Sequence, residues 1–214
     1  MIGGKTLFLL LAGAVTLGAG IWLGQAFTRP ATAPALEISG IYLPEPQEVT
    51  AFTLTDQNGQ PFTQEDFQDV WTFLLFGYTY CPDVCPMTLA ELSTVQQRLA
   101  QQGMDQDTAY VLISVDPERD TPERLGEYTA YFNKKFQGAT GSPAELTKLT
   151  RQLGVVYMPS PGQKDKQNYT VDHSATLILI DPDARLHAIF TPPHAPEALI
   201  ADFLKIRERY STIN

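Results

Sequence analysis

The sequence predicts an α/β sandwich built on a mixed sheet, because short apolar segments that suit strands alternate with longer segments of helical periodicity. One apolar run, residues 71–78, is rich in aromatic residues and has the composition of a buried strand. Capping residues followed by proline mark helix starts at residues 120–123 and 142–145. We therefore expect one domain in which helices flank a sheet.

The expected elements follow one another along this domain. A hairpin is expected at residues 52–63, where Asn58 and Gly59 would supply the positive φ angles of its turn. The remaining expected segments are strand 71–78, a helix from Pro86 to about 102, strand 109–115, a helix from about 120, a helix from 142 to about 154, strands 168–171, 176–181 and 185–190, and a helix from Pro196 to about 210. We expect Asp116, Glu118 and Asp120 to cap helices and form turns rather than act as an acid and base pair.

The N-terminal segment predicts a membrane anchor. Residues 6–28 carry no charge, and as a helix they would span about 34 Å, enough to cross a hydrocarbon core of about 30 Å. The chain then divides into a cytoplasmic stub (1–5), one N-terminal transmembrane helix (6–28), a proline-containing linker (29–47) and the α/β domain (48–214). A cleaved signal peptide remains an alternative, because small residues at 31–35 offer cleavage sites.

The flanks of this segment predict where the domain resides. Lys5 precedes the segment and Arg29 follows it, which gives a weak preference for an inside N-terminus. No Arg-rich, Ser-rich presequence comes before it, so a bacterial origin is favoured. We expect a single-pass protein of the bacterial inner (plasma) membrane with its domain on the periplasmic side.

The charge balance excludes one class of partner. The chain has 15 Lys and Arg against 24 Asp and Glu, a formal net charge of -9. Such a chain repels phosphate backbones and anionic lipid head groups, so we expect no nucleic-acid binding.

Both cysteines lie in one short segment between the strand at 71–78 and the following helix. At this spacing Cys81 and Cys85 can close a disulfide or hold one metal ion. Because Pro86 suits the first helical position, the helix dipole should lower the thiol pKa, although Asp83 opposes that shift. A disulfide closing so short a loop would stabilise the fold by only about 2 kcal/mol, so redox or metal chemistry is favoured.

His173 is the candidate third ligand, because it stands just before the apolar strand 176–181. A lone histidine at a strand end is also typical of a hydrogen-bonded surface residue. His187 and His194 are expected to be structural or solvated. Two thiolates and one imidazole suit Cu(I) and can also hold Cu(II), whereas zinc would need a fourth ligand such as water or Asp83.

Three separated blocks then agree in order and spacing with a known family. GYTYCPDVCP (77–86), SVDPERDTP (114–122) and DHS (172–174) resemble the Sco/SenC proteins, and the resemblance covers about residues 45–210. It implies a thioredoxin-like fold, a membrane anchor and copper bound by Cys81, Cys85 and His173. It also implies a role in assembling the dinuclear copper centre of cytochrome c oxidase.

Two functions follow from these residues. The first is a copper metallochaperone rather than an enzyme, with the copper-bearing subunit of cytochrome c oxidase or its apo-domain as partner, and another copper chaperone as a further partner. The alternative is a thiol-disulfide oxidoreductase in which Cys81 attacks a partner disulfide and Cys85 resolves the product. Unlike ordinary thioredoxin-like oxidoreductases, this chain has three residues between its cysteines, and Ala175 where their cis-proline is expected.

Overall fold

The computed structural model describes residues 36–159, 169–173 and 175–213, together with residues 3, 13, 16–18 and 20. The chain divides into two units, Met1–Ala35 and Leu36–Asn214. Most of the predicted stub and anchor lies outside the described residues. Across the part of the chain that is described, no helix is both long enough and apolar enough to cross a membrane.

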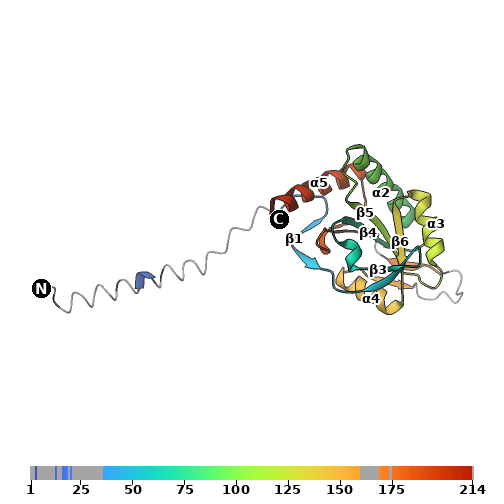
Figure 1. Ribbon diagram of the computed structural model, residues 1–214, viewed down its shortest axis with the longest axis horizontal. Helices are drawn as coiled ribbons and strands as arrows, with labels where there is room; N and C mark the ends of the chain where they lie inside the picture. The colour runs from blue at the N-terminus through green and yellow to red at the C-terminus, as the bar shows by residue number, and fades with distance from the viewer. Residues whose placement is uncertain are drawn as a thin grey trace. The chain divides into compact units, whose positions relative to one another are not determined.

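The second unit alternates strands with helices (Figure 1). Its strands are β1 (Ile41–Glu48), β2 (Thr53–Asp56), β3 (Pro61–Thr63), β4 (Trp71–Gly77), β5 (Thr108–Ser114), β6 (Phe136–Thr140), β7 (Tyr157–Pro159), β8 (Val171–His173), β9 (Leu177–Ile180) and β10 (Arg185–Phe190). Its helices are the 3-10 helix η1 (Gln64–Phe67) and the α-helices α2 (Val84–Gln101), α3 (Pro122–Phe132), α4 (Pro143–Gln152) and α5 (Pro196–Ile213). β1, β6, β7 and η1 are not among the predicted elements.

The main sheet is mixed, as predicted. Its strand order is β1-β10-β9-β4-β5-β6-β2-β3, and β7 pairs with β8 in a separate ribbon. β4, β5 and β6 run parallel to one another, whereas β4 pairs antiparallel with β9, and β9 with β10. The predicted α/β class, a mixed sheet flanked by helices, is therefore confirmed.

β4 is buried along its whole length, because both faces of the sheet are covered. Phe73 and Leu75 join the core cluster to which α2, α3 and α5 contribute, while Leu74 and Phe76 join the cluster that includes α4. In Figure 1, α2 and α5 lie on one side of the strands and α4 on the other. This alternation of side chains along a strand gives the domain two cores and fixes the end of β4 between them.

The predicted linker, residues 29–47, contains a strand at its C-terminal end. β1 pairs antiparallel with β10, and Ile41 lies opposite Ile189. Pro44 and Pro46 favoured a tether, but β1 is an edge strand, where a missing backbone N–H costs little. The linker prediction is therefore wrong for residues 41–47.

The predicted hairpin is present as β2 and β3, but its turn differs from the expected one. Gly59 has a positive φ of 76°, and Asn58 does not have a positive φ. The Asp56 carboxylate accepts hydrogen bonds from the N–H groups of Asn58 at 2.8 Å and Gln60 at 2.7 Å. Four residues connect the strands, and hairpin loops of that length are most often built around a type I turn, whose central residues have negative φ, rather than around the expected two-residue turn.

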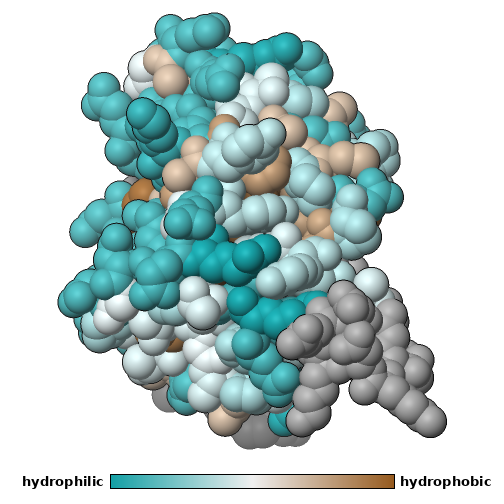
Figure 2. All heavy atoms as spheres, turned by 90° about the vertical axis from the view of Figure 1, so that its right-hand side faces the viewer, coloured by the Kyte–Doolittle hydropathy of each residue, from teal (hydrophilic) through white to brown (hydrophobic). Residues whose placement is uncertain are grey.

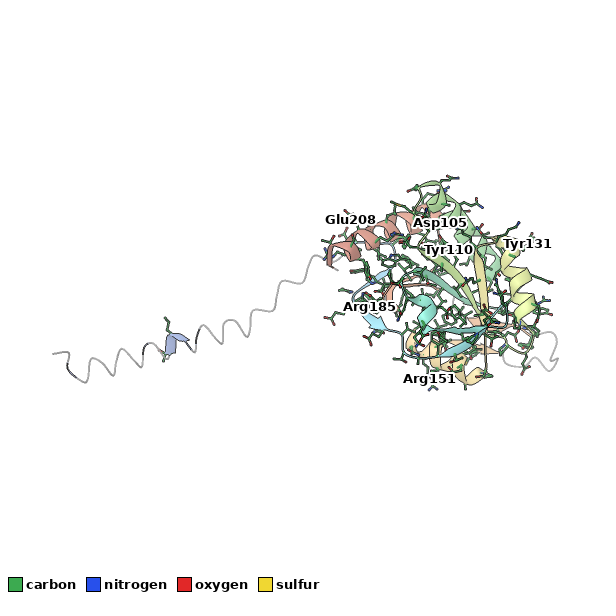
Figure 3. The ribbon with its side chains drawn as sticks, viewed as in Figure 1. Asp105, Tyr110, Tyr131, Arg151, Arg185 and Glu208 are labelled. Carbon is green, nitrogen blue, oxygen red and sulfur yellow. The ribbon has the colours of Figure 1, made fainter. Side chains whose placement is uncertain are left out.

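The face that carries α3 is mostly hydrophilic, with hydrophobic residues scattered over it (Figure 2). Tyr131 lies on the outer side of α3, with 84% of its surface exposed (Figure 3). Tyr110, by contrast, lies inside the domain and stacks on Phe73. Single exposed apolar residues are ordinary on protein surfaces, so this face points to no particular partner.

Candidate metal centre

Both cysteines lie where β4 ends and α2 begins, as predicted. Cys81 belongs to residues 78–83, here called the cysteine loop, and Cys85 lies in the first turn of α2. The helix starts at Val84 rather than at Pro86, with Asp83 as its N-cap residue. Proline is tolerated in this first turn because the N–H groups there have no partner within the helix. The cysteines therefore lie beside the unpaired N–H groups of a helix end.

The two cysteines are not joined by a disulfide, and their side chains hydrogen-bond to each other. Cys81 is 8% exposed and Cys85 is fully buried. The backbone N–H of Cys85 donates to Cys81 Sγ at 3.5 Å, so the helix end holds the first sulfur. Gly77 lies against the second sulfur, because a Cβ atom added there would be 2.6 Å from Cys85 Sγ. The end of β4 and the start of α2 thus fix both sulfurs.

The pKa of the Cys85 thiol is raised, first by its hydrogen bond to Cys81 and then by burial. The negative charge of a Cys81 thiolate raises it further. The predicted lowering by the helix N-terminus is therefore wrong for Cys85, because the neighbouring sulfur and the burial outweigh the helix end. A soft cation between the sulfurs would offset this repulsion, so the pair suits a thiophilic metal such as copper.

A buried carboxylate from the second motif block holds the cysteine loop. Asp120 accepts hydrogen bonds from the Thr79 N–H at 2.9 Å, the Thr79 hydroxyl at 2.6 Å and the Ser114 hydroxyl at 2.6 Å. Burial raises the pKa of Asp120, and these hydrogen bonds oppose the rise. From its sequence, Asp120 is expected only to cap a helix or form a turn. Its partner Thr79 lies just before Cys81 in the sequence, and the joint occurrence of the two motif blocks was the available signal for this contact.

Arg119 braces the cysteine loop against the segment that leads into β8. Its Nε donates to Asp116 at 2.5 Å, and the Tyr169 hydroxyl donates to the same carboxylate. The Arg119 guanidinium lies 3.6 Å from the centroid of the Tyr169 ring and 4.7 Å from that of Tyr80. Arg124 also lies over Tyr80, at 4.2 Å. These cation–π contacts and the ion pair connect residues far apart in the sequence at one end of the sheet.

His173 is the last residue of β8, and β8 pairs antiparallel with β7. His173 was predicted to stand at the mouth of the next strand, and the ribbon in which Tyr157 lies opposite His173 was not predicted. The side chain of His173 lies outside the described residues, so the three-ligand set stays a prediction. Among the side chains that are described, no group of three or more His, Cys, Asp or Glu residues could hold a metal ion.

Two buried side chains hold the backbone on either side of His173. The Val171 N–H donates to the Tyr78 hydroxyl at 3.2 Å, and His194 Nε2 lies 2.6 Å from the Ala175 carbonyl oxygen. The pKa of Tyr78 is raised, mainly by burial and further by the charges of the two thiols. Tyr78, Val171 and both cysteines belong to the same core cluster, so the start of β8 packs on the side of the sheet that holds the cysteine pair.

The other two histidines are structural, as expected, and neither is solvated. His187 is 4% exposed, and its Nδ1 lies 2.9 Å from the buried Asp181 carboxylate. His194 is 3% exposed and follows the cis peptide bond between Pro192 and Pro193. Both imidazoles therefore contribute to packing and hydrogen bonding inside the domain.

A dithiol at the turn between a buried parallel strand and a helix, in a mixed sheet flanked by helices, defines a thioredoxin-like protein. The SCO1/SenC family model matches residues 42–208 of the chain. The chain belongs to the SCO1/SenC family.

Similar proteins carry copper in solved structures. Bradyrhizobium japonicum ScoI with copper bound is 37% identical, with a TM-score of 0.65 over 74% of this chain and 99% of that one. The mitochondrial SCO1 homolog 1 of Arabidopsis thaliana is 33% identical over 74% of this chain, which spans only 47% of that relative. BsSco, described as a member of the Sco family of cytochrome c oxidase assembly proteins, is 22% identical with a TM-score of 0.60 over 79% of this chain and 98% of that one, which shows the fold alone.

Proposed function

We propose that this protein is a copper metallochaperone that binds one copper ion through Cys81, Cys85 and His173. The observation that carries the proposal is the pair of hydrogen-bonded, nearly buried thiols at the start of α2. Thiolates are the ligands that Cu(I) prefers, and an imidazole completes a three-coordinate site. Copper-bound relatives of the same family support this choice of metal.

The proposed destination of the copper is the dinuclear copper site of cytochrome c oxidase. The protein would deliver copper to that site or keep its thiols reduced, as a binding and transfer protein rather than an enzyme. Membership of the SCO1/SenC family supports this partner, because the resemblance to Sco/SenC proteins implies a role in assembling that copper centre. Another copper chaperone would supply the metal.

We also propose that residues 6–28 anchor the chain in the bacterial inner membrane, with the domain on the periplasmic side. Residues 1–5 would then be cytoplasmic and residues 29–40 would tether the domain. The absence of charge over residues 6–28 supports the anchor. Membrane fractionation with an alkaline wash tests it: an anchored chain stays with the membranes, and a cleaved chain appears in the periplasmic extract.

The alternative is a thiol-disulfide oxidoreductase, and the contact between the two thiols favours it. The Cys81 thiolate would attack a partner disulfide and release one partner thiol. Cys85 would then attack the mixed disulfide and release the second, leaving the partner reduced and Cys81 and Cys85 joined. Cys81 suits the attacking role because it is the more exposed thiol, at 8% against 0% for Cys85.

An anaerobic Cu(I) titration against a competing chelator separates these functions. The reduced full-length chain in detergent should take up one tight equivalent, and Cys81→Ser or Cys85→Ser should abolish tight binding. His173→Ala should weaken it while leaving disulfide exchange with a model disulfide intact. Equal Cu(I) affinity of the wild type and His173→Ala would overturn the three-ligand site.

A further inference from the structure

We propose that His194 is a positioning residue for the copper site, because it fixes the backbone that follows His173. The inference rests on the proposed function, in which His173 is the third copper ligand. His194 does not itself bind the metal in this account. It acts through Ala175, whose carbonyl oxygen it holds.

The hydrogen bond of His194 is directed at the main chain. Its Nε2 lies 2.6 Å from the Ala175 carbonyl oxygen, and because a carbonyl can only accept, Nε2 must carry the proton. Nδ1 is then an acceptor in the neutral ring, and it is buried without a hydrogen-bond partner among the described residues. A buried unpaired nitrogen costs stability, so an apolar side chain would suit this site better if packing were its only role.

Ala175 lies across a cavity from the helix that carries Cys85. The cavity, of about 290 Å³, is lined by Ala175 and His194 on one side and by residues of the first turns of α2, including Val84 and Met87, on the other. Ala175, whose carbonyl oxygen His194 holds, therefore lines the same cavity as the start of α2. The position of Ala175 therefore helps to determine how far the backbone after His173 lies from the two thiols.

A second anchor holds the other side of His173. The Tyr78 hydroxyl accepts the N–H of Val171, and Tyr78 is buried at 1% exposure. Tyr78 and His194 thus fix the chain at positions 171 and 175, and His173 lies midway between them. If the contact of His194 is removed, Tyr78 still holds the backbone before His173. The loss of Cu(I) affinity should therefore be partial.

Residues that orient metal ligands commonly change metal affinity by about 10–100-fold when they are replaced. His194 acts on the backbone next to the ligand rather than on the ligand itself, so we expect about a tenfold effect, at the lower end of that range. A purely structural role would instead lower stability without a specific link to His173.

A double-mutant cycle on the full-length, reduced chain tests this link. Cu(I) affinity is measured by chelator competition for the wild type, His194→Leu and His194→Gln, each with His173 present and with His173→Ala. Glutamine places an amide N–H near the position of Nε2 and can still donate to Ala175, whereas leucine cannot. Urea unfolding of each variant reports stability separately.

We expect His194→Leu to weaken Cu(I) binding about tenfold when His173 is present and to have no effect in the His173→Ala background. His194→Gln should restore most of the affinity. Equal effects of His194→Leu in both backgrounds, or no rescue by glutamine, would overturn the inference while leaving the copper site intact. If His173→Ala alone left the Cu(I) affinity unchanged, the proposed ligand set would fail first. Should His194→Leu not unfold cooperatively, His194→Asn replaces it, because its shorter amide does not reach Ala175, and the same outcomes apply.

Discussion

Gly77→Ala should disturb the metal centre more than a single added methyl group normally disturbs a protein. The new Cβ atom would lie 2.6 Å from Cys85 Sγ and 3.2 Å from Leu112 Cδ1. Carbon atoms in contact normally lie about 3.5–4.0 Å apart, and sulfur is larger, so the sulfur must move by about 1 Å or more. Both neighbours lie in a packed core, where overpacking costs about 1–3 kcal/mol.

Two measurements on Gly77→Ala follow from this geometry. For a domain of this size, such a cost lowers the thermal midpoint by roughly 2–4 °C per kcal/mol. A 1 Å displacement of one ligand should also weaken Cu(I) binding by about 10–100-fold in chelator competition, the range seen when ligand orientation is lost.

Gly126→Ala is the matched control. A Cβ atom there would lie 3.4 Å from its nearest neighbour, Gln57 Cβ, which is ordinary contact, and Gly126 lies within α3. Alanine is the better helix former by about 1 kcal/mol, so this variant should be at least as stable as the wild type, with unchanged Cu(I) affinity. If Gly77→Ala unfolded at the wild-type temperature and bound Cu(I) with wild-type affinity, the claim that β4 fixes the sulfur of Cys85 would be refuted.

Three further predictions concern the groups around this centre. Asp120→Ala leaves the Thr79 N–H and two hydroxyls without their acceptor, so the free energy of unfolding in urea should fall by about 3 kcal/mol; a loss below about 1 kcal/mol would show that water replaces the carboxylate. Burial of Asp181 would raise its pKa, but hydrogen bonds from His187 and Arg185 leave the pKa of this carboxyl below its ordinary value. Ionised Asp181 therefore stabilises the folded protein above about pH 4, and this stabilisation is lost as the pH falls through the folded-state pKa. Asp181→Asn should flatten the acid limb of the unfolding midpoint measured between pH 6 and pH 2, and an unchanged limb would contradict the assignment. Oxidation of Cys81 and Cys85 removes both sulfur ligands at once, so diamide-treated protein should bind no tight Cu(I) until a reductant restores it, and retained binding would rule out a dithiolate site.

The sequence predicts which residues carry the chemistry of the metal centre better than it predicts the contacts that hold those residues in place. The class of fold, the β4 strand and the position of both cysteines follow from apolar patterning and from proline and capping signals, which act over a few residues. β1 was missed because prolines at an edge strand resemble those of a tether. β7 was missed because it has only three residues, too few for a periodic pattern, and the strand predicted at 168–171 begins only at Val171 and ends at His173.

The contacts that hold the cysteine loop could not be predicted for a different reason. Asp120 and Thr79 are separated by 41 positions, and nothing in the local sequence of either residue identifies the other as its partner. The raised pKa of Cys85 likewise depends on burial and on the neighbouring sulfur, both of which are products of tertiary packing. The start of α2, which can be predicted from the sequence, would lower the pKa of Cys85, but burial and the neighbouring sulfur outweigh it.

The most direct test of the central claim is X-ray absorption spectroscopy at the copper edge of the reduced, full-length chain loaded with one equivalent of Cu(I). We expect two sulfur scatterers and one imidazole nitrogen, with the imidazole signal lost in His173→Ala. A first shell of sulfur alone in the wild type, or an imidazole signal that persists without His173, would contradict this expectation.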